Sequence, residues 1–217
     1  MTVYADFILL VVVVLDLYIV ATSRLVSCVR ALTLQGIALA ILPLALWGRA
    51  FDGQAIHIVV ISVGTLVAKG LLIPLLLFQT IRAVNVRREV EPSISLHLSL
   101  LIAGLLVGIS FWLARLLVLP VAVPVTLLVP VALATLLVGF LVLVSRRQAI
   151  TQVVGYLMLE NGVFLFGQTL VEQVPFVVEL GILLDVLVGV FVMGIAIHHI
   201  SREFDHIDTD LLTKLKD

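Results

Sequence analysis

Charged residues and cysteine are both scarce in this sequence. Only 12% of its 217 residues are charged, whereas an ordinary soluble domain carries about 25%. The single cysteine, Cys28, excludes an intrachain disulfide, a four-cysteine iron–sulfur site and a multi-thiolate metal site built from this chain alone. The sequence also lacks a phosphate-binding loop and a dinucleotide fingerprint, and its basic residues form no single patch for nucleic acid. We therefore expect no cofactor bound by this chain and no nucleic-acid partner.

Long apolar runs dominate what remains, since 62% of the residues are hydrophobic. A bilayer core needs roughly 20 apolar residues per helix. We therefore predict an all-α integral membrane protein with about seven transmembrane helices. The predicted spans are 4–22, 31–48, 55–81, 94–114, 121–144, 149–169 and 175–199. No basic residue precedes the first run, which favours a retained span over a signal peptide.

The basic residues are distributed unevenly between the two sides of these spans. Arg49 and Arg115 fall on one side, and the other side holds Arg24, Arg30, Arg82, Arg87, Arg88, Arg146, Arg147, Arg202, Lys214 and Lys216. The positive-inside rule then predicts an external N-terminus and a cytoplasmic C-terminus. The tail, 201–217, has an apolar face at helical spacing and predicts a short amphipathic helix, which lies either on the membrane or on a cytoplasmic partner.

Three charged residues interrupt the apolar runs at similar depths. At about 1.5 Å per residue, Glu160 lies about 16 Å into its span, Asp185 about 15 Å and Lys69 about 21 Å. Each such charge costs roughly 2.5–3.5 kcal/mol on insertion scales. The three are therefore predicted to share one layer near the membrane centre. Glu179 lies nearer the outer surface and faces a different direction from Asp185.

The residues around these charges predict polar helix faces. Gln152 and Tyr156 share a face with Glu160, which Asn161 follows, and Thr65 shares a face with Lys69. Pro74 follows Lys69 closely and cannot donate to the carbonyl of Gly70, so a kink is expected there. Asp16 lies toward the cytoplasmic end of the first span and is interpreted as a structural residue that pairs with Arg24 or Arg30.

Two interpretations of the charged layer are open. A low-dielectric surrounding favours the neutral form of a carboxyl group, and a nearby lysine favours the ionised form. Glu160, Asp185, Lys69 and Glu179 are therefore candidates for a proton relay. The alternative is a static ion pair that holds helices together.

The segments Gly155–Gly162 and Val178–Ile195, with the tail motif Phe204–Leu212, resemble the hydrogenase-4 component E family. That family is related, through its last three spans, to the K subunit of complex I and to the C subunit of Mrp antiporters. The resemblance implies a four-span region at 1–120, a K-like three-helix region at 121–200 and a tail at 201–217. Members of the K type carry two glutamates on a central proton path. Glu160 matches the first; Glu179 matches the second by residue type, and Asp185 matches it by depth.

The resemblance also implies a non-catalytic membrane subunit of a group 4 [NiFe] hydrogenase or formate hydrogenlyase-type complex in a prokaryotic cytoplasmic membrane. Its expected partners are antiporter-like subunits, the membrane anchor of the electron-transfer arm and hydrogenase subunits, which would hold the NiFe and iron–sulfur centres. Membrane lipid would surround the rest. Two other functions are open: a free-standing secondary transporter, which a faint internal repeat favours, and a purely structural subunit.

Overall fold

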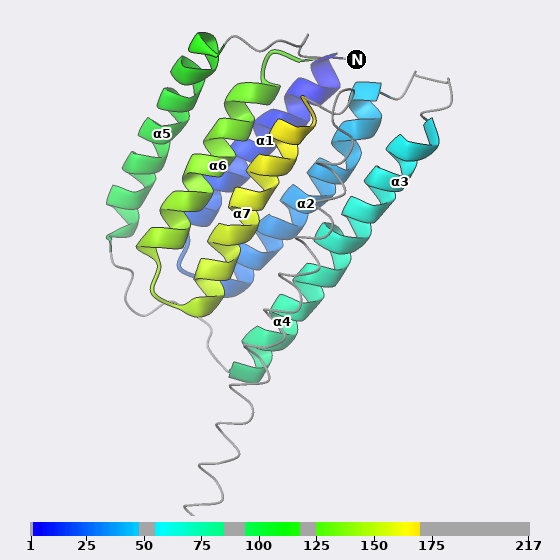
Figure 1. Cartoon of the computed structure of the whole chain (residues 1–217). Coiled ribbons are helices and arrows are strands. Elements are labelled where there is room, and N and C mark those ends of the chain that lie inside the picture. Colours follow the sequence, from blue (N-terminus) through cyan, green and yellow to red (C-terminus); the bar gives the residue numbers. More distant parts are fainter. Residues whose placement is uncertain (1, 48–54, 85–93, 118–124, 170–217) are drawn as a thin grey trace, which may run out of the picture.

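The computed structural model describes residues 2–47, 55–84, 94–117 and 125–169. These residues form a bundle of helices that run alternately up and down (Figure 1). Six helical segments of this part are long and apolar enough to cross a membrane. Helices suit such a chain because every backbone N–H and C=O within a bilayer has to be satisfied inside the protein. The predicted seventh span at 175–199 and the tail at 201–217 lie outside the described residues.

The bounds of the helices follow the predicted spans, with two corrections at their starts. The helices are α1 (Thr2–Ala21), α2 (Leu25–Trp47), α3 (Ala55–Thr65), η1 (Leu66–Leu72), α4 (Ile73–Val84), α5 (Leu96–Leu116), α6 (Leu128–Ser145) and α7 (Ala149–Gly167). Helix α2 begins six residues before the predicted start at residue 31, because Leu25 and Val29 are buried while Arg30 stays exposed on another side of the helix. Helix α6 begins at Leu128 rather than at residue 121.

The third span, predicted at 55–81 with a kink beside Lys69, is not a continuous α-helix. Its middle, η1, is a π-helix, and the N–H of Ile73 donates to the carbonyl of Ala68, five residues earlier. Pro74 follows closely and has no N–H to offer to Gly70, so one α-helical hydrogen bond is missing at this point. Proline thus marked the irregular stretch in the sequence, but the wide turn that forms there was not predicted. Lys69 lies within it.

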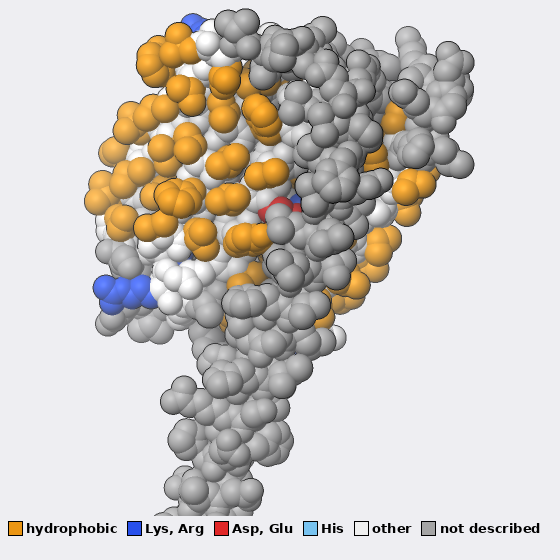
Figure 2. All heavy atoms as spheres, in the orientation of Figure 1, with side chains coloured by type: hydrophobic (Ala, Val, Ile, Leu, Met, Phe, Trp, Pro, Cys, Tyr) orange, Lys and Arg blue, Asp and Glu red, His pale blue; other side chains and the backbone are white. Residues whose placement is uncertain are grey.

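Helices α1, α2, α6 and α7 form the centre of the bundle, with α5 beside α6 and α1, and the α3–η1–α4 span beside α2 (Figure 1). Much of α5 and of the third span faces outward. Figure 2 shows the result on one face, where hydrophobic side chains cover most of the described surface and basic side chains lie near its two ends. Such a surface suits contact with lipid or with other membrane subunits.

Arg146 ties the loop between α6 and α7 to the end of α1. It is buried, and its guanidinium donates to the carbonyl of Val20 over 2.9 Å. The last carbonyls of a helix have no partner within the helix, and a cation there also faces the negative end of the helix dipole. Arg146 therefore stabilises the contact between this loop and α1, in addition to its use in predicting the topology.

Candidate functional site

The buried interior of the bundle consists of two apolar clusters with a polar layer between them. We call one the upper cluster because it contains residues near the N-terminus, which Figure 1 labels at the top. It contains Ala5, Leu9, Val12, Leu39, Leu42, Leu128, Val131, Ala132, Phe164 and Leu165. The lower cluster contains Ile19, Val20, Leu25, Leu32, Leu77, Ile81, Val138, Val142, Val154 and Met158. The polar layer consists of Asp16 (α1), Gln35 (α2), Lys69 (η1), Thr135 (α6), Glu160 and Asn161 (α7), all buried. On α1, α2, α6 and α7, the polar residue falls between the residues of the two clusters.

Lys69 and Glu160 form a buried ion pair at one end of this layer. The Nζ of Lys69 donates to Oε1 of Glu160 over 2.8 Å, and the two side chains are only 6% and 2% exposed. The ammonium also lies 5.6 Å from the centre of the Phe164 ring, within the range of a cation–π contact. The two residues are 91 positions apart in sequence, and their predicted depths placed them in the same layer.

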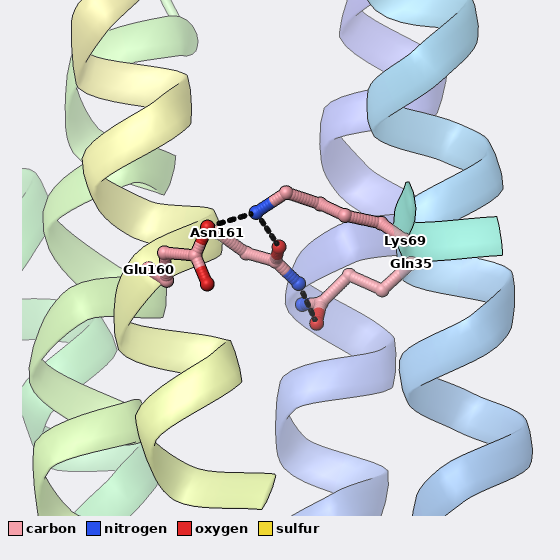
Figure 3. Close-up of polar contacts among 4 residues, drawn as sticks. All are labelled: Gln35, Lys69, Glu160 and Asn161. Atoms are coloured by element: carbon pink, nitrogen blue, oxygen red, sulfur yellow. Dashed lines mark hydrogen bonds and ion pairs between the residues drawn. The ribbon is translucent and has the colours of Figure 1, made fainter. Parts of the chain in front are cut away.

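The ion pair continues into a line of hydrogen bonds through two side-chain amides. Lys69 Nζ also donates to Oδ1 of Asn161 over 3.0 Å, and Nδ2 of Asn161 donates to Oε1 of Gln35 over 3.0 Å (Figure 3). The amide of Gln35 then donates through Nε2 to Oδ1 of Asp16 over 2.7 Å. Thr135 completes the line by donating its hydroxyl to Oδ2 of Asp16 over 2.7 Å. Six buried side chains from five helical segments are thus joined.

Gly36 on α2 allows the backbone of η1 to approach closely. A Cβ atom at Gly36 would lie 2.7 Å from the carbonyl oxygen of Lys69 and 2.9 Å from its Cβ. Real Cβ atoms essentially never come this close, so only glycine fits without a shift of one helix. Small residues of this kind let transmembrane helices pack at short range. The close approach at Gly36 therefore places Lys69 beside Gln35, the residue that precedes Gly36 in the sequence.

Two further glycines hold α7 against α6 in the same way. A Cβ atom at Gly155 would lie 2.5 Å from the backbone nitrogen of Leu143, and one at Gly162 would lie 2.6 Å from that of Leu136. Gly162 follows Asn161 and Leu136 follows Thr135, so this close approach lies at the polar layer itself. The helix pair thereby fixes the height of Glu160 relative to Thr135.

The supporting residues predicted from sequence have different outcomes. Asn161 belongs to the polar layer, Thr65 is buried one turn before Lys69, and Tyr156 is half-buried one turn before Glu160. Gln152 lies outside the layer: it is exposed, and its amide donates to the carbonyl of Arg146 over 3.1 Å at the start of α7. Helical spacing alone placed it on the face of Glu160, although it lies two turns away. Asp185 and Glu179 lie outside the described residues.

The interpretation of Asp16 was wrong in its partners. Asp16 accepts hydrogen bonds from Gln35 and Thr135 in the polar layer, and not from Arg24 or Arg30. The error arose because its depth was counted from the end of a single helix, which says nothing about the direction of the side chain. Gln35 and Thr135 were missed altogether. Gln35 carried a usable signal, since it is a buried amide in the middle of a span, whereas a threonine in a helix carries almost none.

The side chains of this layer include groups that can bind a proton. The layer combines two carboxyl groups with one ammonium group, in a surrounding that is apolar above and below. An ammonium next to a carboxylate stabilises its ionised form, and the loss of that contact favours the protonated form. Within the described part of the chain, no group of three or more histidine, cysteine or acidic residues is placed to bind a metal ion.

The sequence is similar to several known proteins. The sequence matches no family model, and no solved structure matches it. It is 34% identical over 207 residues to an uncharacterized protein of Mycobacterium tuberculosis, covering 94% of this chain and 92% of the relative. It is 30% identical over 155 residues to hydrogenase-4 component E of Escherichia coli K12, covering 71% of this chain and 72% of the relative, and the Shigella flexneri protein of that name matches equally. The chain belongs to the hydrogenase-4 component E family.

Proposed function

We propose that this chain is a membrane subunit of a hydrogenase complex and that Lys69 and Glu160 form part of its proton-translocation path. The observation that supports the path is the ion pair itself: a 2.8 Å contact between two nearly unexposed side chains in the middle of an apolar bundle. The family supports the assembly. At a finer level, the complex is of the group 4 [NiFe] or formate hydrogenlyase type, and other subunits hold its redox centres.

Glu160 takes up and releases the proton, and Lys69 changes its main hydrogen-bond partner when it does so. When Glu160 is ionised, it holds the ammonium at 2.8 Å. When it takes a proton, the attraction falls, and Lys69 keeps its bond to Asn161 and its contact with Phe164. Because Asn161 neighbours Glu160 on the same helix, Lys69 can change its main partner without leaving α7. The π-helical turn around Lys69 fits this role, since such turns occur frequently at functional sites.

The path needs acidic partners beyond this pair. Asp185 and Glu179 are the candidates within this chain: Asp185 as a group at the same depth and Glu179 as an exit group nearer the outer surface. Antiporter-like subunits and the membrane anchor of the electron-transfer arm would supply the groups on either side. The chain lies in the cytoplasmic membrane, with its N-terminus outside and its C-terminus in the cytoplasm, as the arginines and lysines of its loops predict.

Replacement of Glu160 by glutamine tests the path. Glu160→Gln keeps the size of the side chain and an acceptor for Lys69, but it cannot bind a proton at this site. In membrane vesicles that contain the whole complex, we expect hydrogen turnover to continue and hydrogen-dependent proton transport, followed with a pH-sensitive dye, to be lost. Lys69→Arg is the matched variant, because it retains the positive charge while removing the point-like ammonium; transport should fall and assembly should persist.

The outcomes separate the proposed function from its alternatives. If Glu160→Gln leaves both assembly and proton transport intact, the pair is a static contact and the path lies elsewhere. Affinity purification of the full chain tests the assembly: a hydrogenase protein and large membrane subunits should purify with it. A stable single chain that binds a small solute would instead identify a secondary transporter.

A further inference from the structure

Asp16 is a buried carboxyl group that the proposed path does not use. It is fully buried, and its two oxygens accept from Gln35 and Thr135, both neutral donors. Helices α2, α5 and α6 pack against α1. Their described titratable or charged side chains are Cys28 and Arg30 on α2 and His97 and Arg115 on α5, with none on α6. None of them forms a hydrogen bond or ion pair with Asp16, so its only described link to a cation runs through the two amides to Lys69.

The direction of those amides follows from the groups at the two ends of the line. An ammonium has donors only, and an ionised carboxylate has acceptors only. Asn161 accordingly turns its oxygen to Lys69, and Gln35 turns its nitrogen to Asp16. The remaining bond, Nδ2 of Asn161 to Oε1 of Gln35, forms only when both amides point the same way. The cation at one end and the anion at the other thus stabilise the same arrangement of the amides.

The line transmits charge and does not conduct protons. A carboxamide neither takes up nor gives up a proton near neutral pH, so no proton passes through Asn161 or Gln35. The line instead couples the orientations of the two amides, because polarised hydrogen bonds in a low-dielectric interior strengthen one another. A change of charge at Asp16 is therefore felt at Lys69, although no proton travels between them.

We infer that Asp16 is a second proton-binding group of this chain, coupled to the Lys69–Glu160 pair through Gln35 and Asn161. The surroundings of Asp16 favour this role, because both of its described partners are neutral donors and no described cation contacts it directly. Uncompensated charge in an apolar surrounding is costly. The proton comes from water and returns to water, and on Asp16 its new O–H donates either to Oγ1 of Thr135 or to a reversed Gln35 amide.

Coupling gives Asp16 a regulatory place in the path, and this part of the inference rests on the proposed function. While Asp16 is ionised, the aligned amides present the oxygen of Asn161 to Lys69, which gives the ammonium a second partner beside Glu160. Once Asp16 is protonated, the charge that aligns the amides is gone, and Lys69 depends more on Glu160. The protonation state of Asp16 therefore sets how readily Lys69 leaves Glu160.

Infrared difference spectroscopy of the purified complex in lipid, recorded across a pH series, tests the inference. The C=O stretch of a protonated carboxyl group is resolved from the amide bands, and isotope-labelled aspartate distinguishes Asp16 from Glu160. We expect Asp16→Asn to remove one titrating band and Glu160→Gln to remove another. Each substitution should also shift the titration midpoint of the remaining group. In the Gln35→Leu background, that mutual shift should be lost while both bands still titrate.

Three results would overturn the inference. An unchanged spectrum in Asp16→Asn would show that Asp16 does not titrate. If replacing either carboxyl group leaves the titration midpoint of the other at its wild-type value, the line carries no coupling. If Asp16→Asn fails to fold, Thr135→Val serves instead, since loss of a 2.7 Å hydroxyl bond must shift the Asp16 band; an unshifted band overturns the assignment. Failure of the proposed function looks different: transport survives Glu160→Gln although Asp16 still titrates.

Discussion

Removal of one partner of the Lys69–Glu160 pair should destabilise the bundle more than removal of both. The pair is nearly unexposed, so Lys69→Met removes the ammonium from a buried carboxyl group, and Glu160→Gln removes a carboxylate from a buried ammonium. Breaking a buried pair in this way typically costs about 3–5 kcal/mol. Glu160→Gln should fall at the lower end of that range, because Lys69 retains its bond to Asn161 and its contact with Phe164.

The unfolding free energy of the double variant Lys69→Met/Glu160→Gln is the informative measurement. This variant removes both charges of the pair together, and replacement of a whole buried pair by neutral side chains often changes stability little. Because the double variant should lose less stability than either single variant, the coupling free energy between the two substitutions should be at least about 3 kcal/mol, at or above the top of the range found for residues in contact. Unfolding of the full chain in mixed micelles with increasing denaturing detergent, followed by circular dichroism, gives the four free energies of the cycle.

Additivity would refute this reasoning. If the two single losses sum to the loss of the double variant within about 0.5 kcal/mol, the residues do not interact in the folded chain. The same result would remove the structural basis of the proposed proton path. The cycle by itself does not separate a relay from a static contact, because both contain the ion pair; only the transport assay on Glu160→Gln separates them.

Two further substitutions test how the layer is positioned. Gly36→Val should cost about 1–3 kcal/mol by overpacking and reduce transport, since its Cβ would lie 2.7 Å from the Lys69 carbonyl; Gly104→Val is the control, because a Cβ there meets no described atom within 4 Å. Equal losses of unfolding free energy in the two valine variants would show that the approach at Gly36 is unimportant. Arg146→Met should lower the unfolding free energy by about 1.5–3 kcal/mol through loss of a charged hydrogen bond to Val20, and an unchanged denaturation midpoint would contradict that.

The spans were predictable because lipid imposes a simple rule on sequence. A run of about 20 apolar residues has to form a helix, since no other structure satisfies its backbone in a bilayer. Six predicted spans correspond to helical segments of the structure. Their ends were less predictable, as the early start of α2 shows: an arginine near the membrane surface can extend outward from a helix that has already begun, so Arg30 marked the surface and not the first residue.

The site was predictable in depth but not in direction. Counting residues from the end of each span placed Lys69 and Glu160 at one level. The high free-energy cost of a charge within a membrane indicated that both residues have a role. The partners of Asp16 depend on which helices are neighbours and how each is rotated, and this follows from packing at positions such as Gly36 and Gly162. A threonine such as Thr135 costs little in a helix, so it stands out only when the bundle brings it to a carboxylate.

The position of the layer favours a path that runs sideways through the membrane rather than across this chain. The upper and lower apolar clusters lie on both sides of the layer in the described bundle. If Glu160 carries a proton as proposed, a lateral route from a neighbouring subunit avoids both apolar clusters. A lone transporter would need access to both surfaces from its own bundle. A subunit placed between others needs only a central layer open at its flanks, and this requirement favours the complex over the lone transporter as the setting in which Lys69 and Glu160 act.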